Sequence, residues 1–163
     1  MRAVSNTSPI SNLASIDRLG FLRSQFPELW IPDAVAQELR AHPDIGARSR
    51  IERALQEGWF QVGSPRDSPL LRILQLQLHP GEAETIALAA DIGADIVLID
   101  EQEGRQFAAK AGVAVTGVLG ILLRAKRAGE LNAVKPAIDE LRRRASFFVS
   151  ASLEARIVAA AGE

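Results

Sequence analysis

Cysteine is absent from the sequence and histidine is scarce, with only His42 and His79 among 163 residues. The absence of cysteine excludes disulfide bonds and thiolate zinc sites, and two imidazoles give no basis for a structural zinc ion. No run of eighteen apolar residues occurs, and the N-terminus lacks the charged segment and apolar core of a signal peptide. We therefore expect a soluble, cytoplasmic protein with no membrane contact.

An excess of charge of one sign is also absent, because the formal net charge is −1 at pH 7. Sequence-independent binding to nucleic acid draws most of its strength from neutralised phosphates, so bulk charge alone does not support it. Basic residues are nevertheless clustered at 48–53, 124–127 and 142–144. These clusters are either solvated helix faces that complement helix dipoles, or a rim that binds phosphate.

The chain has the length of one domain, which we place at residues 1–163 with a core at about 2–145 and a C-terminal extension at 146–163. Short apolar segments alternate with longer amphipathic ones, a pattern typical of alternating strands and helices. This alternation predicts the α/β class, as a three-layer α/β/α sandwich with a mostly parallel central sheet. The expected strands are residues 2–5, 29–31, 59–62, 96–99 and 113–115, with 147–150 as a further edge strand.

Helices are expected between these strands and after the last of them. At the first one, Ser8 is a good N-cap and Pro9 suits the first helical position, whereas capping does not explain Asn6. The last one is expected to be capped by Ser152. The expected helices begin at residue 9 or span residues 19–26, 33–41, 46–57, 70–78, 80–93, 101–112, 118–129, 135–144 and 152–162.

Polar side chains follow two strands at the points where each strand ends. Asn6 follows the first strand, and Asp100 with Glu101 follows the four apolar residues 96–99. In a parallel α/β sheet, residues that face a ligand lie just beyond the carboxyl ends of the strands. If these two strands are neighbours, about 4.8 Å apart, Asn6 and Asp100 meet.

Three further acids lie on helices near the expected site. Glu38 borders the buried stripe of the helix after the second strand, and Glu82 and Glu84 occupy the first turn of the helix before the fourth. Each also has an ordinary interpretation, as a surface helix former or as a complement to a helix dipole. Clustered oxygen ligands without histidine or cysteine suit Mg²⁺ or Mn²⁺, which can activate water for attack on a phosphodiester.

Taken together, five sequence segments resemble a known family. The segments are "VSNTSP", "PDAVAQEL", "GEAETIALA", "LID" and "VTGVLGILLRAKRAG". The chain resembles PIN-like domains over residues 2–145, in particular small prokaryotic proteins close to the VapC toxins of toxin–antitoxin pairs. The resemblance implies a parallel α/β/α sandwich, acids at the carboxyl edge of the sheet, and ribonuclease activity that depends on Mg²⁺ or Mn²⁺.

The resemblance also implies roles for individual residues. The catalytic positions fall on Glu38, Glu84 and Asp100, and the metal ligands are these three together with Asn6 and Glu101. Glu82 and Thr116 are second choices.

The departure from the family pattern is Asn6, because active PIN domains commonly carry Asp there. An amide oxygen can still bind a metal ion, but it brings no negative charge, so we expect reduced ion affinity.

Two functions of different classes follow from these observations. The first is a metal-dependent endoribonuclease, the toxin-like component of a toxin–antitoxin pair, acting on single-stranded or structured RNA and bound by a small antitoxin protein. The alternative is a catalytically weak or inactive module that binds RNA or a protein partner, for which Asn6 and the near-zero net charge are the motivation. A nucleotide-binding domain is disfavoured because no glycine-rich phosphate loop follows any strand. A homodimer is compatible with the apolar stretch at 70–78.

Overall fold

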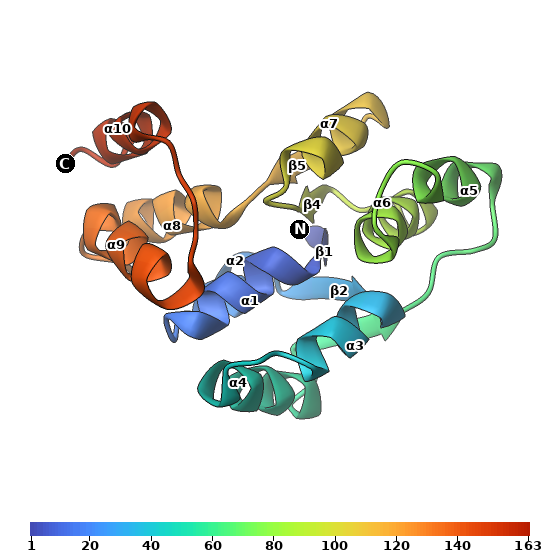
Figure 1. Cartoon of the computed structure of the whole chain (residues 1–163), viewed down its shortest axis with the longest axis horizontal. Helices are drawn as coiled ribbons and strands as arrows, with labels where there is room; N and C mark the ends of the chain where they lie inside the picture. Colours follow the sequence, from blue (N-terminus) through green and yellow to red (C-terminus); the bar gives the residue numbers. More distant parts are fainter.

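The centre of the molecule is a sheet of five parallel strands in the order β3-β2-β1-β4-β5 (Figure 1). The computed structural model describes all residues, 1–163. β1 lies between β2 and β4, and each strand begins and ends within one residue of its expected position. The strands are β1 (Arg2–Ser5), β2 (Glu28–Pro32), β3 (Phe60–Gly63), β4 (Ile96–Leu98) and β5 (Ala114–Thr116).

Ten helices connect or follow the strands. None of them combines the length and the apolar composition that a membrane span requires. They are α1 (Thr7–Ser15), α2 (Gly20–Gln25), α3 (Asp33–Arg40), α4 (Ile45–Gln56), α5 (Pro69–Gln75), α6 (Pro80–Ile92), α7 (Gln102–Lys110), α8 (Val118–Arg127), α9 (Val134–Ala145) and α10 (Ala151–Ala160).

The two faces of the sheet have separate hydrophobic cores. Successive strand residues point to opposite faces, so Ala3 lies in the larger core, whereas Val4 lies in the smaller one. The larger core includes side chains of α1–α4, α8 and α9, and the smaller core includes those of α5, α6 and α7. The sheet lies between these two groups of helices in Figure 1. The expected three-layer α/β/α sandwich is confirmed.

Two expected helix starts are wrong by two residues. Asn6 occupies the N-cap position of α1, although its side chain makes no capping hydrogen bond, so Ser8 lies inside the first turn. At α10 the cap is Ser150, whose hydroxyl accepts a hydrogen bond from the backbone N–H of Leu153, and not Ser152. In both places several serine or asparagine residues stand close together, and composition alone does not distinguish them.

Residues 147–150 do not form the expected edge strand. They form an irregular link between α9 and α10 that starts after Ser146, which ends α9 in the left-handed conformation with φ 52°. The apolar residues of this link have another use, since Phe147 and Val149 pack against the larger core. A short apolar run thus reflects burial here and not sheet pairing.

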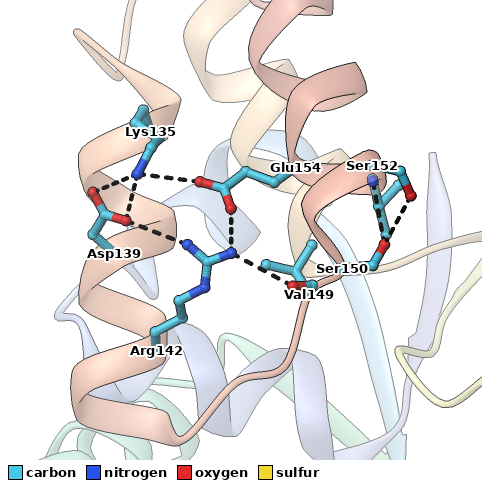
Figure 2. A network of polar contacts seen from close by, with 8 residues as sticks. Lys135, Asp139, Arg142, Val149, Ser150, Ser152 and Glu154 are labelled. Carbon is cyan, nitrogen blue, oxygen red and sulfur yellow. Dashed lines mark hydrogen bonds and ion pairs between the residues drawn. The ribbon is translucent and has the colours of Figure 1, made fainter.

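The C-terminal helix α10 is held to α9 by charged side chains (Figure 2). The Glu154 carboxylate accepts a hydrogen bond from the Arg142 guanidinium and lies 3.1 Å from Lys135 Nζ. Lys135 and Arg142 also pair with Asp139 on α9, and Arg142 Nη2 donates to the backbone carbonyl of Val149. No residue of α10 is fully buried, and these contacts add to the packing of Ile157 and Ala161 against the larger core.

Glu154→Gln is expected to lower the stability of the protein in a pH-dependent way. The hydrogen bond from Arg142, then that from Lys135, lowers the pKa of Glu154 from its ordinary 4.5 to about 2. Its contribution is therefore present above pH 4.5 and is lost as the pH falls toward 2. Thermal unfolding should show a lower midpoint for the variant at pH 7 and a shrinking difference below pH 4.5. Glu140→Gln, which removes the more exposed ion pair with Arg143, is the control, and an equal effect of both variants would contradict this assignment.

Candidate functional site

The pairing of β1 with β4 places Asn6 at the carboxyl edge of the sheet. In this pair Ser5 lies opposite Leu98, and the backbone N–H of Asn6 donates to the Leu98 carbonyl at 2.9 Å. The buried side chain of Asn6 donates from Nδ2 to Oε2 of Glu101 at 3.2 Å. The two strands are neighbours as expected, but the residue that Asn6 contacts is Glu101 and not Asp100.

Around Asn6 lies a cavity of about 260 Å³ in which no lining residue is hydrophobic. Three of its lining residues are acids that come from different parts of the chain: Glu38 from α3, Glu82 from α6 and Glu101 from the N-cap position of α7, after β4. The complete lining is Asn6, Thr7, Ser8, Glu38, His79, Pro80, Gly81, Glu82 and Glu101. The fold therefore collects three carboxylates and one amide around a single hollow.

Each of these carboxylates is oriented by a neighbouring donor. The Thr7 hydroxyl donates to Oε2 of Glu38 at 2.6 Å, and the Ser8 hydroxyl donates to Oε1 of Glu101. The backbone N–H of His79 donates to Oε2 of Glu82 at 3.3 Å. The hydroxyls of Thr7 and Ser8, which follow Asn6 at the end of β1, are thus hydrogen-bond partners of the acids.

Glu82 is the acid whose titration is most clearly affected within this cavity. It is buried, and this burial raises its pKa, while the charges of Glu101 and Glu103 act in the same direction. The hydrogen bond from His79 opposes the shift. A buried acid next to another carboxylate is disfavoured in its charged form, so a bound cation would stabilise it.

Gly81 allows two of the oxygen atoms to approach each other. A Cβ atom added there would lie 3.0 Å from Oε1 of Glu38 and 3.1 Å from Oδ1 of Asn6. Both oxygens therefore point to the same small volume beside the start of α6. Gly104 likewise leaves room for the Glu82 carboxylate, since a Cβ there would lie 3.2 Å from Oε1 of Glu82.

The donor atoms of the cavity fit a hard divalent cation by type. They are carboxylate, amide and hydroxyl oxygens, which suit Mg²⁺ or Mn²⁺ and not zinc or copper. In their present positions, no group of three or more His, Cys, Asp or Glu side chains is arranged to hold a metal ion. Their carboxylates are bonded instead to the donors described above.

Asp100 points away from this cavity. Its Oδ1 accepts the backbone N–H of Val118 at 2.7 Å, and its Oδ2 accepts Nδ2 of Asn12 at 3.1 Å. Burial raises the pKa of Asp100 to about 6. Asp100 lines a different groove, together with Thr116, so the structure separates these two expected site residues from the acids of the cavity.

Glu84 does not line the cavity either. Successive residues of an α-helix are about 100° apart, so residues two apart point to nearly opposite sides. Because Glu82 faces the cavity, Glu84 faces away from it. Of the expected site residues, the structure brings together Asn6, Glu38, Glu101 and the second choice Glu82, and it leaves Glu84, Asp100 and Thr116 outside the group.

A second hollow of about 480 Å³ adjoins the cavity and shares Thr7 and Glu38 with it. His42 lies here with Nε2 2.7 Å from the Ser11 hydroxyl oxygen. The backbone N–H of Asp44 donates to Nδ1 of His42, so the proton of the neutral ring is on Nε2. His42 is therefore a donor to Ser11 and cannot take its proton, which argues against a serine nucleophile.

Sequence reasoning missed several residues of this cavity. Thr7, Ser8, His79 and Gly81 line it but were not expected site residues. Two features of the sequence could have indicated them: the polar segment 6–8 directly after β1, and Pro80 with Gly81 at the start of α6.

The parallel sheet and the acids beyond its carboxyl edge define an α/β/α domain with a polar, acidic cavity at the ends of its strands. A family model described as a PIN domain, DUF3368, matches residues 2–163. The chain belongs to this family of PIN domains, and the resemblance found in the sequence is confirmed. PIN domains are generally nucleases, and they usually use divalent metal ions. No curated protein matches this sequence.

Asp100→Asn is expected to become more stable relative to the wild type as the pH rises from 4 to above 6. The ordinary pKa of an aspartate is 3.8, and burial raises that of Asp100 to about 6, so folding favours the protonated acid. The stability that protonation provides is lost as the pH rises through 6, by up to about 3 kcal/mol. Urea unfolding in EDTA between pH 4 and 8 measures this difference. Glu52→Gln, an exposed acid on α4, is the control, and parallel pH profiles of wild type and Asp100→Asn would refute the expectation.

Proposed function

We propose that this protein is a divalent-metal-dependent endoribonuclease whose active site is the polar cavity around Asn6. The observation that carries the proposal is the convergence of Glu38, Glu82 and Glu101 with the Asn6 amide at the carboxyl edge of the sheet. This is the place where a parallel α/β fold binds its ligand. Membership of the PIN domain family supports a nuclease in general, and the oxygen donors support a metal-assisted hydrolysis.

In this proposal the residues of the cavity have distinct roles. Asn6, Glu38, Glu82 and Glu101 would hold Mg²⁺ or Mn²⁺, which when bound would supply an activated water and a clamp for phosphate oxygens. Thr7 and Ser8 orient Glu38 and Glu101 through their hydroxyls. Glu84 and Asp100 are not assigned catalytic roles, and Asp100 instead accepts the first backbone N–H of α8.

The adjoining hollow supports a nucleic-acid substrate. It continues from the cavity through Thr7 and Glu38, and it adds the side chains of Ser11, His42 and Arg144. Arg144 is exposed and makes no ion pair within the protein, so its charge is available to a phosphate. One available arginine beside three acids gives too little positive charge to bind RNA by bulk charge. It suits RNA binding in which a metal ion supplies the remaining positive charge.

The toxin-like role is part of the proposal. A small antitoxin protein would be encoded next to this gene, and it should co-purify with the protein and inhibit RNA cleavage. A second candidate function, RNA binding without turnover, is favoured by one observation. Asn6 brings no charge to the first position of the site, so the ion affinity is expected to be lower than an aspartate would provide.

Replacing the acids of the cavity is expected to abolish RNA cleavage. Glu38→Gln, Glu82→Gln and Glu101→Gln each remove one carboxylate, and a loss of several kcal/mol of charge stabilisation lowers the rate by about a hundredfold or more. The measurement is cleavage of labelled RNA with Mg²⁺ or Mn²⁺, and with EDTA. Glu84→Gln, two residues along the same helix, is the matched control and should keep its activity. Multiple turnover that survives all three cavity substitutions would overturn the proposal.

Asn6→Asp is expected to increase the affinity for Mn²⁺ by about tenfold or more. At an effective dielectric constant of about 20, unit charges about 4 Å apart interact by about 4 kcal/mol, part of which screening removes. The same change removes the Nδ2 donor to Glu101, so the metal-free variant should be less stable than the wild type. Unfolding midpoints against Mn²⁺ concentration measure both effects. Asn132→Asp adds the same charge at an exposed position outside the cavity and should not change the Mn²⁺ dependence; equal dependence in all three proteins would contradict the assignment of Asn6.

A further inference from the structure

A separate groove of about 360 Å³ lies at the same edge of the sheet, beyond the ends of β4 and β5. It begins at Asp100, directly before the cavity residue Glu101, and reaches the link between α9 and α10. Five of its eleven lining residues are hydrophobic, so its lining is mixed and not simply apolar. Its polar lining includes Asp100, Gln102, Arg105 and Thr116, and its aromatic side chains are Phe147 and Phe148.

Phe148 is the most exposed large hydrophobic side chain of the chain, at 86%. Its two neighbours are packed, since Phe147 lies against the larger core and Val149 is buried. A single exposed apolar residue is ordinary on a protein surface. Here, however, the ring borders a groove, and the backbone on both sides of it is held in place.

The backbone around Phe148 is held by the contacts that attach α10 (Figure 2). Arg142 Nη2 donates to the carbonyl of Val149 and also binds Glu154, and the N–H of Phe147 donates to the Leu141 carbonyl at 3.2 Å. The segment is thus fixed while the Phe148 ring is left without a protein partner. Such preorganisation lowers the entropic cost of binding a ligand to that ring.

The polar lining of the groove offers the groups that recognise the edge of a base. Arg105 donates from Nη1 to the Ile99 carbonyl at 2.9 Å, which uses one of its five N–H donors, and its charge also acts on the nearby Asp100 carboxyl. Gln102 adds an amide and Thr116 a hydroxyl. Recognition of unpaired RNA bases combines stacking on aromatic side chains with hydrogen bonds to the edges of the bases.

We propose that this groove binds an unpaired base of a single-stranded RNA next to the phosphate in the acidic cavity, with the base stacked on Phe148. The inference rests on the proposed ribonuclease function, and it uses the adjacency of two consecutive residues, since Asp100 lines the groove and Glu101 lines the cavity. A strand that passes over the cavity brings its next nucleotide to the groove. Arg105 and Gln102 then contact the base edge or its phosphate.

The test is the affinity of a fluorescent single-stranded RNA of about ten nucleotides, measured by anisotropy with Ca²⁺ in place of Mg²⁺ and Mn²⁺. The RNA is checked to be intact after each measurement. Phe148→Ala and Phe148→Leu should weaken binding by about fivefold or more, which corresponds to about 1 kcal/mol for one stacked base, whereas Phe148→Trp should retain it. Leu76→Ala removes another exposed apolar side chain, 82% exposed, and should have no effect.

The outcomes separate this inference from the proposed function. Equal affinities of wild type, Phe148→Ala and Phe148→Leu would overturn the stacking role, even if the wild type cleaves RNA. Loss of affinity in both variants with retention in Phe148→Trp would support it, even if no cleavage is found. Absence of RNA binding by the wild type would overturn it. So would a loss of self-association in Phe148→Ala with unchanged RNA affinity, which would make the groove an interface between proteins.

Discussion

The parallel pairing of β1 with β4 is the constraint on which the rest of the site depends. These strands are separated by more than ninety residues of sequence, yet Ser5 lies opposite Leu98 and Asn6 continues the ladder by donating to the Leu98 carbonyl. Once this register is set, Glu101 must emerge beside Asn6, and Thr7 and Ser8 must begin α1 above the same edge. Slipping it by one residue would turn Asn6 toward the other face of the sheet.

The buried position of Glu82 beside other acids has an electrostatic cost that the protein only partly offsets. Hydroxyls of Thr7 and Ser8 and the backbone N–H of His79 each bond one carboxylate, yet burial still raises the pKa of Glu82. Nothing in the packing of the sheet requires three acids here, because the hydrophobic cores lie on its two faces. A buried acid that costs stability and serves no packing need is best explained by a ligand of opposite charge.

More of the fold than of the site could be predicted from the sequence. Short apolar runs located all five strands within one residue. The continuous apolar signal of a strand buried on both faces is clearest at β4, whose three residues are all buried, whereas β3 and β5 at the edges are partly exposed. The choices between Glu82 and Glu84 and between Asp100 and Glu101 were beyond sequence reasoning. Each depends on the direction of a side chain in the first residues after a strand or at the start of a helix, where tertiary hydrogen bonds decide and periodicity does not. The apolar residues 147–150 were wrongly expected to form a strand, because their burial comes from contact with the larger core and not from sheet pairing.

The side chains of the consecutive residues Asp100 and Glu101 point in different directions, and this creates two different environments at the edge of the sheet. Glu101 enters a cavity without hydrophobic lining, whereas Asp100 is buried against the start of α8 and borders a groove that ends at Phe148. The charged groups of the cavity suit a phosphate bound through a metal ion. The aromatic ring beside the groove suits a nucleic-acid base. The ion pairs of Glu154 make the second environment possible, because they fix the link between α9 and α10 without burying the Phe148 ring. The C-terminal helix thus acts as a support that shapes the surface next to the acids.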